Sequence, residues 1–398
     1  MAAYLIKNNI YWVGAVDWNL RSFHGYSTES GSSYNAYLIV DEQVVLIDSV
    51  KAAFTNVLLD NIREIIDPMK IDIIISNHVE PDHSGAITEV LKYAKNAKVY
   101  TSFPTGAKGL TMYYGELPLI PIKSGDSISI GKRTLQFVQT PMVHWPDNMV
   151  TYIPEEKLLF SNDAFGQHIA SSERMDYQLD INIVYTEAKK YFANIVMPYS
   201  QQVKKALDIV TTLDIDIIAP SHGIIWDKYI PQILKFYEEA VSHIKTDKAV
   251  IVYDTMWGST GKIAYAISEA FTNKGVRVKL MNLDFNHISD IITEVMDAKY
   301  LAVGSPTLNN NILPPVAAFL CYLKGLYPKN LKYIVFGSYG WSGQSVSIIE
   351  QELNSLKYAP LIDKINIQFA PTKEQLQDVY NMVSEKIDAK DVKLIKEA

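Results

Sequence analysis

Short apolar runs separated by polar breaks predict that the chain is rich in strands from its start. Between Tyr34 and Asp48, a polar Asp-Glu-Gln turn joins two β-rich stretches, AYLIV and VVLID, which is the pattern of an antiparallel hairpin. Helical spacing follows over residues 52–66, and the buried-strand run IDIIIS then ends in a polar cluster that begins at Asn77. Two more hairpin-like stretches and two stretches of helical periodicity come next, at residues 127–138, 149–160, 187–196 and 201–213. We therefore expect sheets flanked by outer helices.

The pattern changes at the polar stretch KTDK, residues 245–248, where we place a domain boundary. Strand-like and helical segments then alternate: KAVIVYD, VRVKLMNL, KYLAVGSP and LKYIVFGS have helical stretches between them, and a last helix starts at Lys373. This alternation is typical of a doubly wound parallel sheet. The sequence predicts two α/β domains, residues 1–246 and 247–398.

Composition excludes several classes of function. The formal net charge of -7 provides no basic field for a phosphate backbone, so no nucleic-acid partner is expected. The single cysteine, Cys321, excludes a disulfide framework, a cysteine-ligated zinc ribbon and an iron–sulfur or rubredoxin centre within this chain. Electrons for a redox site must then come from an external donor.

The N-terminus MAAYLIKNNI has no secretory-signal pattern, and we expect a cytoplasmic protein. Apolar runs such as IDIIIS and YLAVG are much shorter than the roughly 20 residues that span a bilayer. No membrane segment is predicted.

The segment HVEPDH places four potential metal ligands, His78, Glu80, Asp82 and His83, within six residues at a strand end. Alternate positions of an extended segment point the same way, so His78 and Glu80 suit one metal while Asp82 and His83 suit a second.

Three further polar side chains follow apolar runs: His144 in TPMVHWPD, Asp163 in FSNDAFG and His222 in APSHG. Each alone is typical of an ordinary loop or turn. Together with the four above, they give two metals three terminal ligands each and one shared carboxylate, and leave open positions for a small molecule.

A strand, a loop rich in glycine and hydroxyl groups, and a helix follow each other at residues 254–261, DTMWGSTG. Backbone amides and hydroxyls at such a helix start suit a phosphate, although an ordinary capped helix remains an alternative. An ATP-type P-loop is disfavoured because Met256 and Ile263 replace its glycine and its hydroxyl residue.

Two more strand ends carry polar and aromatic side chains, and in a doubly wound sheet all three loops meet at the carboxyl edge. Their polar groups can hold a flavin ring while Trp257, Tyr339 or Trp341 covers its face, though any single aromatic is also compatible with a core role. The predicted cofactor residues are Thr255, Met256, Trp257, Gly258, Ser259, Thr260, Ser305, Pro306, Thr307, Leu308, Asn309, Asn310, Ser338, Tyr339, Gly340, Trp341, Ser342 and Gly343.

The motif HxExDH with its isolated His, Asp and His resembles the metallo-β-lactamase fold, an αββα sandwich, in its flavodiiron variant. Hydrolases of that superfamily usually carry histidine where this chain has Glu80, and a carboxylate there favours iron over zinc. The resemblance implies a proximal iron bound by His78, Glu80 and His144. It implies a distal iron bound by Asp82, His83 and His222, with Asp163 bridging.

Further sequence segments match the same family: VDWNLRSFHGY, HWPD, NDAFGQH, YFANIVMPYS and SHGIIW. The resemblance places His24, His168 and Tyr191 near the irons, where a histidine or phenol can donate a proton, although simple packing roles are an alternative. His243 and His287 lie in no such segment and are interpreted as surface or structural residues.

Residues 248–398 resemble flavodoxin, which implies FMN. The two resemblances imply an oxidoreductase in which a donor reduces FMN and FMN reduces two non-haem irons. The substrate would be dioxygen, reduced to water, or nitric oxide, reduced to nitrous oxide. Rubredoxin, a reduced deazaflavin cofactor and a nicotinamide-dependent reductase are all possible donors. The family pairing implies a head-to-tail homodimer or a dimer of dimers.

Two other classes remain open at this point. One is a zinc or iron metallo-hydrolase of the β-lactamase superfamily with an attached flavodoxin domain, against which Glu80 and the FMN loop count. The other is a pure electron carrier with a degenerate metal site, against which the full ligand set counts.

Overall fold

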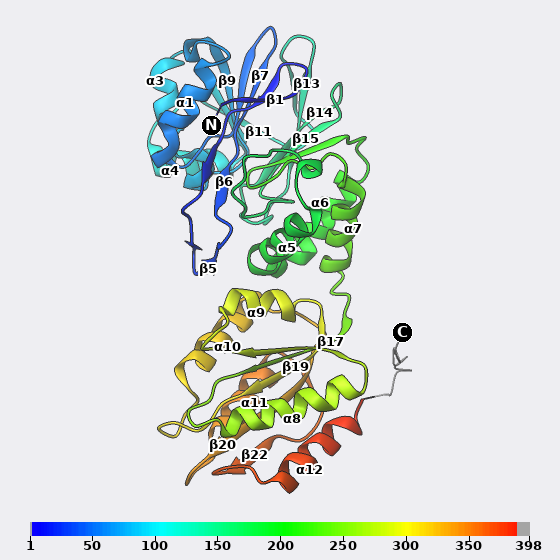
Figure 1. Cartoon of the computed structure of the whole chain (residues 1–398). Helices are drawn as coiled ribbons and strands as arrows, with labels where there is room; N and C mark the ends of the chain where they lie inside the picture. The colour runs from blue at the N-terminus through cyan, green and yellow to red at the C-terminus, as the bar shows by residue number, and fades with distance from the viewer. Residues whose placement is uncertain (1, 388–398) are drawn as a thin grey trace. The chain divides into compact units, whose positions relative to one another are not determined.

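A computed structural model describes residues 2–387 and divides the chain into two compact units, Met1–Val241 and Ser242–Ala398 (Figure 1). The division lies close to the boundary that the sequence indicates at residues 246 and 247.

The first unit contains two main sheets. One has the strand order β1-β2-β7-β8-β9-β10-β11 and the other β12-β13-β14-β15-β16, and two short pairs, β3-β6 and β4-β5, accompany them. The hairpins predicted from the sequence are confirmed, because β7 pairs with β8, β12 with β13, and β14 with β15, each antiparallel. The strands are β1 (Tyr4–Lys7), β2 (Ile10–Trp12), β3 (Ala15–Asp17), β4 (Ser22–Phe23), β5 (Tyr26–Ser27), β6 (Ser32–Tyr34), β7 (Tyr37–Val40), β8 (Val44–Ile47), β9 (Ile71–Ser76), β10 (Lys98–Ser102), β11 (Leu119–Ile122), β12 (Ser127–Ser129), β13 (Thr134–Gln139), β14 (Met149–Ile153), β15 (Leu158–Asn162) and β16 (Ile217–Pro220).

Helices cover the outer face of each sheet, which confirms the αββα sandwich (Figure 1). Apolar side chains that alternate along β7, β8 and β9 send one set between the sheets and the other set against α1, α3 and α4. The helices of this unit are α1 (Thr55–Arg63), α2 (Pro81–Ser84), α3 (Ile87–Tyr93), α4 (Thr105–Tyr114), α5 (Ile181–Tyr191), α6 (Ser200–Val210) and α7 (Ile230–Val241). The periodicity predicted over residues 187–196 corresponds to the end of α5 and a π-helical turn, Phe192–Val196.

The second unit is a parallel sheet in the order β18-β17-β19-β20-β21, with β22 also paired to β20. The predicted doubly wound parallel sheet is therefore confirmed. Its elements are β17 (Thr246–Tyr253), α8 (Ser259–Asn273), β18 (Arg277–Asn282), α9 (Ile288–Val295), β19 (Ala298–Gly304), α10 (Pro314–Leu326), β20 (Lys332–Tyr339), α11 (Ser345–Ser355), β21 (Ala359–Pro360), β22 (Ile365–Gln368) and α12 (Lys373–Ser384).

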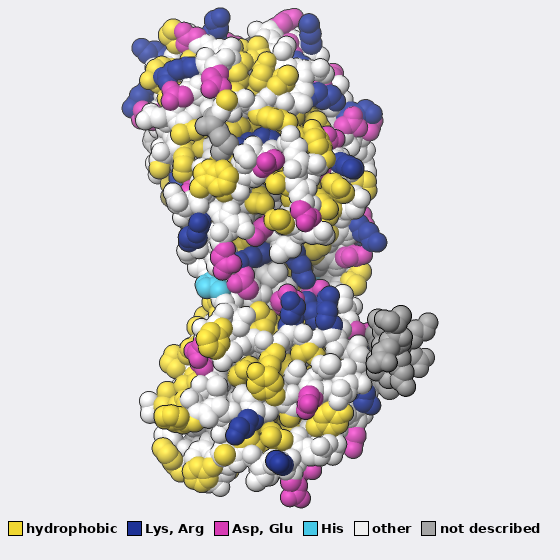
Figure 2. Space-filling view, viewed as in Figure 1, with side chains coloured by type: hydrophobic (Ala, Val, Ile, Leu, Met, Phe, Trp, Pro, Cys, Tyr) yellow, Lys and Arg dark blue, Asp and Glu magenta, His cyan; other side chains and the backbone are white. Residues whose placement is uncertain are grey.

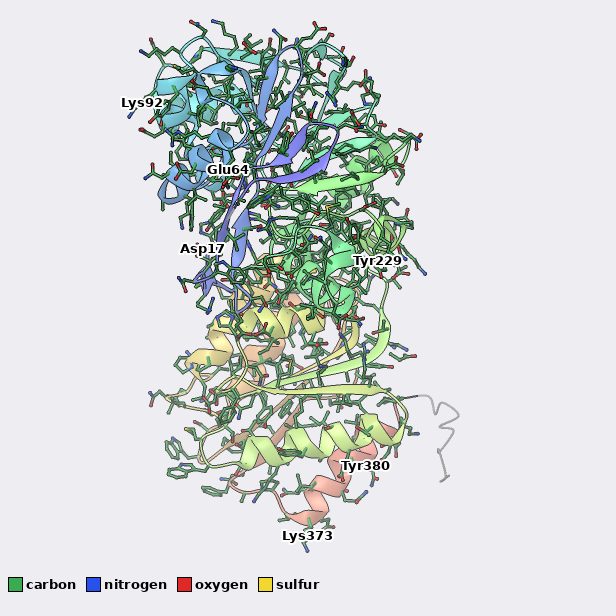
Figure 3. All side chains as sticks on the ribbon, turned by 45° about the horizontal axis from the view of Figure 1, so that its top comes forward. Asp17, Glu64, Lys92, Tyr229, Lys373 and Tyr380 are labelled. Carbon is green, nitrogen blue, oxygen red and sulfur yellow. The ribbon has the colours of Figure 1, made fainter. Side chains whose placement is uncertain are left out.

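Helices α8 and α12 lie side by side on one face of this sheet, over a common apolar core (Figure 1). At the end of α8, Asn273 donates a hydrogen bond from Nδ2 to the hydroxyl of Tyr380 on α12 (3.1 Å; Tyr380 is labelled in Figure 3). Helices α9, α10 and α11 pack on the opposite face. Both faces are thus covered, as a parallel sheet requires.

The KTDK stretch overlaps the first strand of the second unit. Strand β17 begins at Thr246, two residues before the predicted run KAVIVYD, and Lys248 is fully buried within it. The Lys248 ammonium is tolerated there because the carboxylates of Glu294 (2.9 Å) and Asp297 accept its hydrogen bonds. From the sequence alone, a lysine paired inside the fold therefore cannot be distinguished from an exposed one.

The surface carries mixed charges. On the face shown in Figure 2, Lys and Arg side chains are interspersed with Asp and Glu rather than gathered into a field of one sign. No helix within residues 2–387 combines the length and apolar character needed to cross a membrane.

Candidate metal centre and cofactor loops

The seven predicted metal ligands all lie in loops or helix starts that directly follow strands. His78 comes after β9, and the short helix α2 that follows carries Asp82 and His83, with Glu80 immediately before it. The other three, His144, Asp163 and His222, follow β13, β15 and β16. The structure brings all seven together in two groups, whose members match the division that the family resemblance implies.

The first group consists of His78, Glu80, His144 and Asp163. The Glu80 Oε2 atom lies 3.3 Å from Nε2 of His78 and 3.4 Å from Nε2 of His144. The Asp163 Oδ2 atom lies 3.5 Å and 3.3 Å from the same two nitrogens. Ligand atoms bound to one metal at about 2.1 Å are separated by about 3 Å, so this group has the dimensions of a metal site.

The second group consists of Asp82, His83 and His222. The two oxygens of Asp82 lie 3.4 Å from Nε2 of His83 and 3.3 Å from Nε2 of His222. The Asp163 Oδ1 atom completes the group at 3.0 Å from His83 and 3.6 Å from His222. Because its other oxygen faces the first group, Asp163 has the geometry of a bridging carboxylate.

Several of these atoms are buried without a hydrogen-bond partner among the described residues. They are both carboxylate oxygens of Asp82, both of Asp163, and the two ring nitrogens of His83. An unsatisfied buried polar atom costs about 1–3 kcal/mol, and more when it is charged, so a protein rarely keeps so many together. Two cations would satisfy them, and the mixed nitrogen and carboxylate donor set suits iron.

The carboxylates of the site raise the pKa values of its histidines. Burial alone would lower the pKa of His78, but hydrogen bonds with Asp147 and Glu80 outweigh burial and raise this pKa to about 10. For His144 burial also acts downward, and the Asp163 and Glu80 carboxylates, 3.3 and 3.4 Å from its Nε2 atom, raise the pKa to about 10. Without metal, these rings hold protons where a metal would otherwise bind.

The second group behaves in the same way. Burial acts downward on the pKa of His83, and the charges of Asp82 and Asp163 raise it to about 9. Burial acts upward on the pKa of the Asp163 carboxyl, but the positive charge of His83 and the nearby His144 ring hold this pKa well below the usual range. The site therefore pairs ionised carboxylates with cations, whether these are protons or metals.

In two of the candidate ligand histidines, the second ring nitrogen contacts another part of the protein. The Nδ1 atom of His78 lies 2.9 Å from Oδ2 of Asp147, and Nδ1 of His222 donates to the carbonyl of Ser33 (2.7 Å). Both contacts turn Nε2 toward the centre, as is usual for metal-binding histidines. Sequence reasoning missed both partners. Asp147 lies in the HWPD segment, and its position three residues after His144 was a usable signal.

A network of buried polar side chains holds the loops that carry the candidate ligands. Asp48 accepts hydrogen bonds from the backbone and side chain of Asn77 (2.7 and 3.0 Å), and Asn148 donates to the side chain of Asn162 (2.9 Å). Asn77 directly precedes His78, and Asn162 directly precedes Asp163, which means that this network fixes where two ligand loops begin.

The three other predicted catalytic residues surround the metal groups. The His24 Nε2 atom lies 3.2 Å from Oε1 of Glu80, the oxygen that does not contact the ligand histidines, and 72% of the His24 side chain is exposed. His168 and Tyr191 are buried, with the His168 ring centre 4.8 Å from that of His222 and 5.1 Å from that of Tyr191.

Burial fixes the protonation of these two inner residues. It lowers the pKa of His168 well below its usual value, with the neighbouring His222 adding to the effect, so the ring is neutral. The Nδ1 atom of His168 lies 2.8 Å from Oγ of Ser32, while its Nε2 has no hydrogen-bond partner among the described residues. Burial also raises the pKa of Tyr191 well above its usual value, so the phenol keeps its proton.

The remaining histidines lie elsewhere. His287 caps α9 by accepting a hydrogen bond from the backbone of Ser289 (3.3 Å), which is a structural role. For His243, burial and then the nearby Lys245 and Lys329 lower the pKa to about 4.

The three predicted flavin loops meet at the carboxyl edge of the second sheet. The hydroxyls of Thr260 and Ser338 lie 2.9 Å apart, which joins the first loop to the third. The backbone of Thr307 donates to the carbonyl of Ser338 (2.9 Å), which joins the second loop to the third. In the same way, Ser342 donates to Asn310 (3.2 Å).

The start of α8 has the form of a phosphate cradle. Gly258 adopts φ +83° at the N-cap and no side chain caps the helix, so the first amides of α8 are available to an anion. The hydroxyl of Thr255 accepts a hydrogen bond from the Gly258 amide (3.1 Å) and shapes this turn. Trp257 and Trp341 are 93% and 91% exposed, as expected for aromatic rings that stack on a bound ring.

The fold and the two sites define a class: a metallo-β-lactamase-like unit with a dinuclear metal centre, joined to a flavodoxin-like unit. Family models agree, with an ODP family beta lactamase matching residues 33–223 and a flavodoxin matching residues 251–382.

Individual relatives match along the whole chain. A nitric oxide reductase of Moorella thermoacetica is 44% identical, covering 95% of this chain and 96% of that protein. A rubredoxin-oxygen oxidoreductase of Megalodesulfovibrio gigas is 40% identical, covering 98% and 99%. The solved structure of the flavodiiron protein of Giardia intestinalis gives a TM-score of 0.94 at 35% identity, covering 97% and 96%. The chain belongs to the flavodiiron protein family.

Proposed function

We propose that this chain is an oxidoreductase that reduces dioxygen to water, nitric oxide to nitrous oxide, or both. Its family supplies FMN and a non-haem diiron centre as cofactors. The observation that carries the proposal is Asp163, whose two oxygens each face a different pair of histidines.

The ligand set leaves room for a small substrate. One iron would take His78, Glu80 and His144, the other Asp82, His83 and His222, and Asp163 would bridge them. When bound, the irons supply one-electron redox chemistry and Lewis acidity. Three terminal ligands and one shared carboxylate leave coordination positions free at each metal.

Protons are the other requirement of the reaction. Dioxygen takes up four electrons and four protons to give two waters, whereas two nitric oxides take up two of each to give nitrous oxide and water. Tyr191 holds its proton on a phenol beside the second group, and His24 reaches the outer oxygen of Glu80 from solvent. We assign to Tyr191 and His24 the delivery of protons toward the substrate. We assign to His168 the positioning of the side chains that lie between them.

FMN would supply one- and two-electron redox chemistry when bound, and the loops at residues 255–260, 305–310 and 338–343 would hold it. The donor is external, and we propose rubredoxin, the donor in the name of one relative, with a reduced deazaflavin cofactor and a reductase as alternatives. We further propose a cytoplasmic location and a head-to-tail homodimer or dimer of dimers.

The first experiment measures metal and flavin in anaerobically purified protein, then consumption of dioxygen and of nitric oxide by the reduced form. Two irons and one FMN per chain, with gas consumed, would support the proposal and rank the substrates. Zinc in place of iron, with ester or thioester hydrolysis, would instead favour the metallo-hydrolase, and absence of bound iron would favour a pure electron carrier.

Glu80→Ala and Asp163→Ala test the ligand assignment. Each is expected to lower iron content strongly and to abolish gas reduction while FMN remains bound, because the flavin loops belong to the other unit. Glu89→Ala is the matched control. This half-exposed carboxylate forms an ion pair with Lys92, which is labelled in Figure 3, and such pairs contribute at most about 1 kcal/mol. Full activity in either site variant would refute the assignment.

A further inference from the structure

Asp147 is a buried carboxylate beside the metal centre that belongs to neither ligand group. Its Oδ2 atom lies 2.9 Å from Nδ1 of His78 and accepts a hydrogen bond from the backbone of Val79 (2.8 Å). Only 3% of the residue is exposed, so its charge acts on His78 with little screening by water.

The protein holds Asp147 in place from the other side. The hydroxyl of Ser102, at the end of β10, donates to the backbone carbonyl of Asp147 (2.6 Å), and the hydroxyl of Thr105 donates to that of Pro146 (3.1 Å). The Trp145 ring meets the His78 ring edge-on at 5.1 Å. The carboxylate and the imidazole are therefore both fixed in position.

This contact sets which nitrogen of His78 binds a metal. With the Nδ1 proton held by Asp147, Nε2 is left as the donor, and it faces Glu80 and Asp163 at 3.3 and 3.5 Å. A carboxylate partner also increases the basicity of the ring and its donation to a metal.

The other metal group lacks an equivalent. The second nitrogen of His222 binds a neutral carbonyl, that of Ser33, and the Nδ1 atom of His83 has no hydrogen-bond partner among the described residues. Among the described residues, a carboxylate therefore contacts the second ring nitrogen of a histidine in the first group only.

We propose that Asp147 is a positioning residue that fixes the donor nitrogen of His78 and lowers the reduction potential of the iron bound there, which makes the two irons unequal. The inference rests on the proposed diiron function. It adds a residue whose effect on the centre is electrostatic as well as structural.

Asp147→Asn tests this because it keeps the shape of the side chain and removes its charge. We expect zinc affinity of the metal-free protein, measured by competition with a chelator, to fall roughly ten- to hundredfold. In the iron-loaded protein, the midpoint potential of the diiron centre, followed by its mixed-valence EPR signal, should move upward while the flavin potentials stay unchanged.

Two further variants separate charge from packing. Ser102→Ala removes the support of Asp147 but keeps the carboxylate, so it should leave the diiron potential at the wild-type value even if zinc affinity falls. Asp147→Glu keeps the charge and should shift the potential less than Asp147→Asn. If the asparagine variant does not fold, Asp147→Glu is compared with wild type in its place. A shift of the diiron midpoint potential in Asp147→Glu that is larger than the shift in Ser102→Ala would then overturn the proposal.

The outcomes distinguish this inference from the proposed function. Wild-type protein without paired irons would defeat the proposed function itself. Wild-type protein with two irons, together with an Asp147→Asn variant of unchanged zinc affinity and unchanged potential, would defeat the role of Asp147 alone.

Discussion

At the scale of single residues, the metal centre is a balance between carboxylates and the cations that they hold. Glu80 and Asp163 stay ionised because histidine rings with raised pKa values lie against them. In protein without metal these rings carry protons, and metal binding must displace the protons. The same residues therefore link folding stability, metal binding and pH.

The metal-free protein should lose stability as the solution becomes alkaline. The pKa values of His78, His83 and His144 rise from 6.5 to about 10, 9 and 10 in the folded chain. A raised pKa means that the folded state binds the proton more tightly, so this stabilisation is complete below pH 6.5 and is lost as pH increases to about 10. Iron-loaded protein lacks these protons and should not show this loss.

Thermal unfolding of both forms between pH 6.5 and 10 measures the effect. Groups outside the centre titrate in both forms, so the informative quantity is the difference in melting temperature, which should widen as pH increases. A difference that stays constant or narrows over this range would show that the histidines do not carry these protons.

The candidate metal ligands could be predicted from the sequence more completely than the groups that form hydrogen bonds with them. His78, Glu80, Asp82 and His83 could be predicted because four ligand types crowd into six residues, a local signal. The carbonyl of Ser33 that holds His222 could not, because a backbone oxygen leaves no trace in residue type and lies 189 positions away.

At the scale of elements, the strands were predictable where apolar runs are uninterrupted, as in IDIIIS of β9. The predicted run KAVIVYD begins at Lys248, whereas β17 begins two residues earlier, at Thr246. The burial of Lys248 was not predictable, because its ammonium becomes compatible with burial only through Glu294 and Asp297 from α9 and the residues after it. Which loops meet at the flavin edge followed from the parallel order of the sheet, whereas the hydrogen bonds between those loops depend on three-dimensional contacts.

The turn before α8 gives a prediction about the flavin. Gly258 has φ +83°, a conformation that costs a residue with a side chain about 1–2 kcal/mol, and a new Cβ would meet nothing within 4 Å. Gly258→Val should therefore act through the backbone and weaken FMN binding by roughly tenfold, since each 1.4 kcal/mol is a factor of ten. Fluorescence titration of the apo-flavin protein measures this affinity, and iron content should not change.

Gly325→Ala is the control for that variant. This glycine lies inside α10, where an added methyl group also meets nothing within 4 Å, and alanine favours a helix. It should leave FMN affinity unchanged and stability equal or slightly higher. Equal FMN binding in Gly258→Val and wild type would contradict the phosphate cradle at α8.

At the scale of the whole molecule, the chain carries its two cofactor sites in two separate units. Electrons must pass from one to the other in every turnover. The sequence predicted both units through their motifs, but the arrangement of chains in an oligomer depends on surfaces whose partners lie in another copy. The proposed head-to-tail dimer would let the flavin of one chain serve the irons of the other, and mixed dimers test it.

One chain would carry Asp163→Ala, which removes the irons. The other would carry Ser259→Glu, which places a negative charge at the first position of α8, where it suits the helix but repels the phosphate of FMN. Neither homodimer should reduce gas. If electrons cross between chains, doubly tagged mixed dimers contain one complete pair of cofactors and should show about half the wild-type rate per dimer. If electrons stay within a chain, no pair is complete and the mixed dimer will be inactive, even though iron and flavin are both present in it.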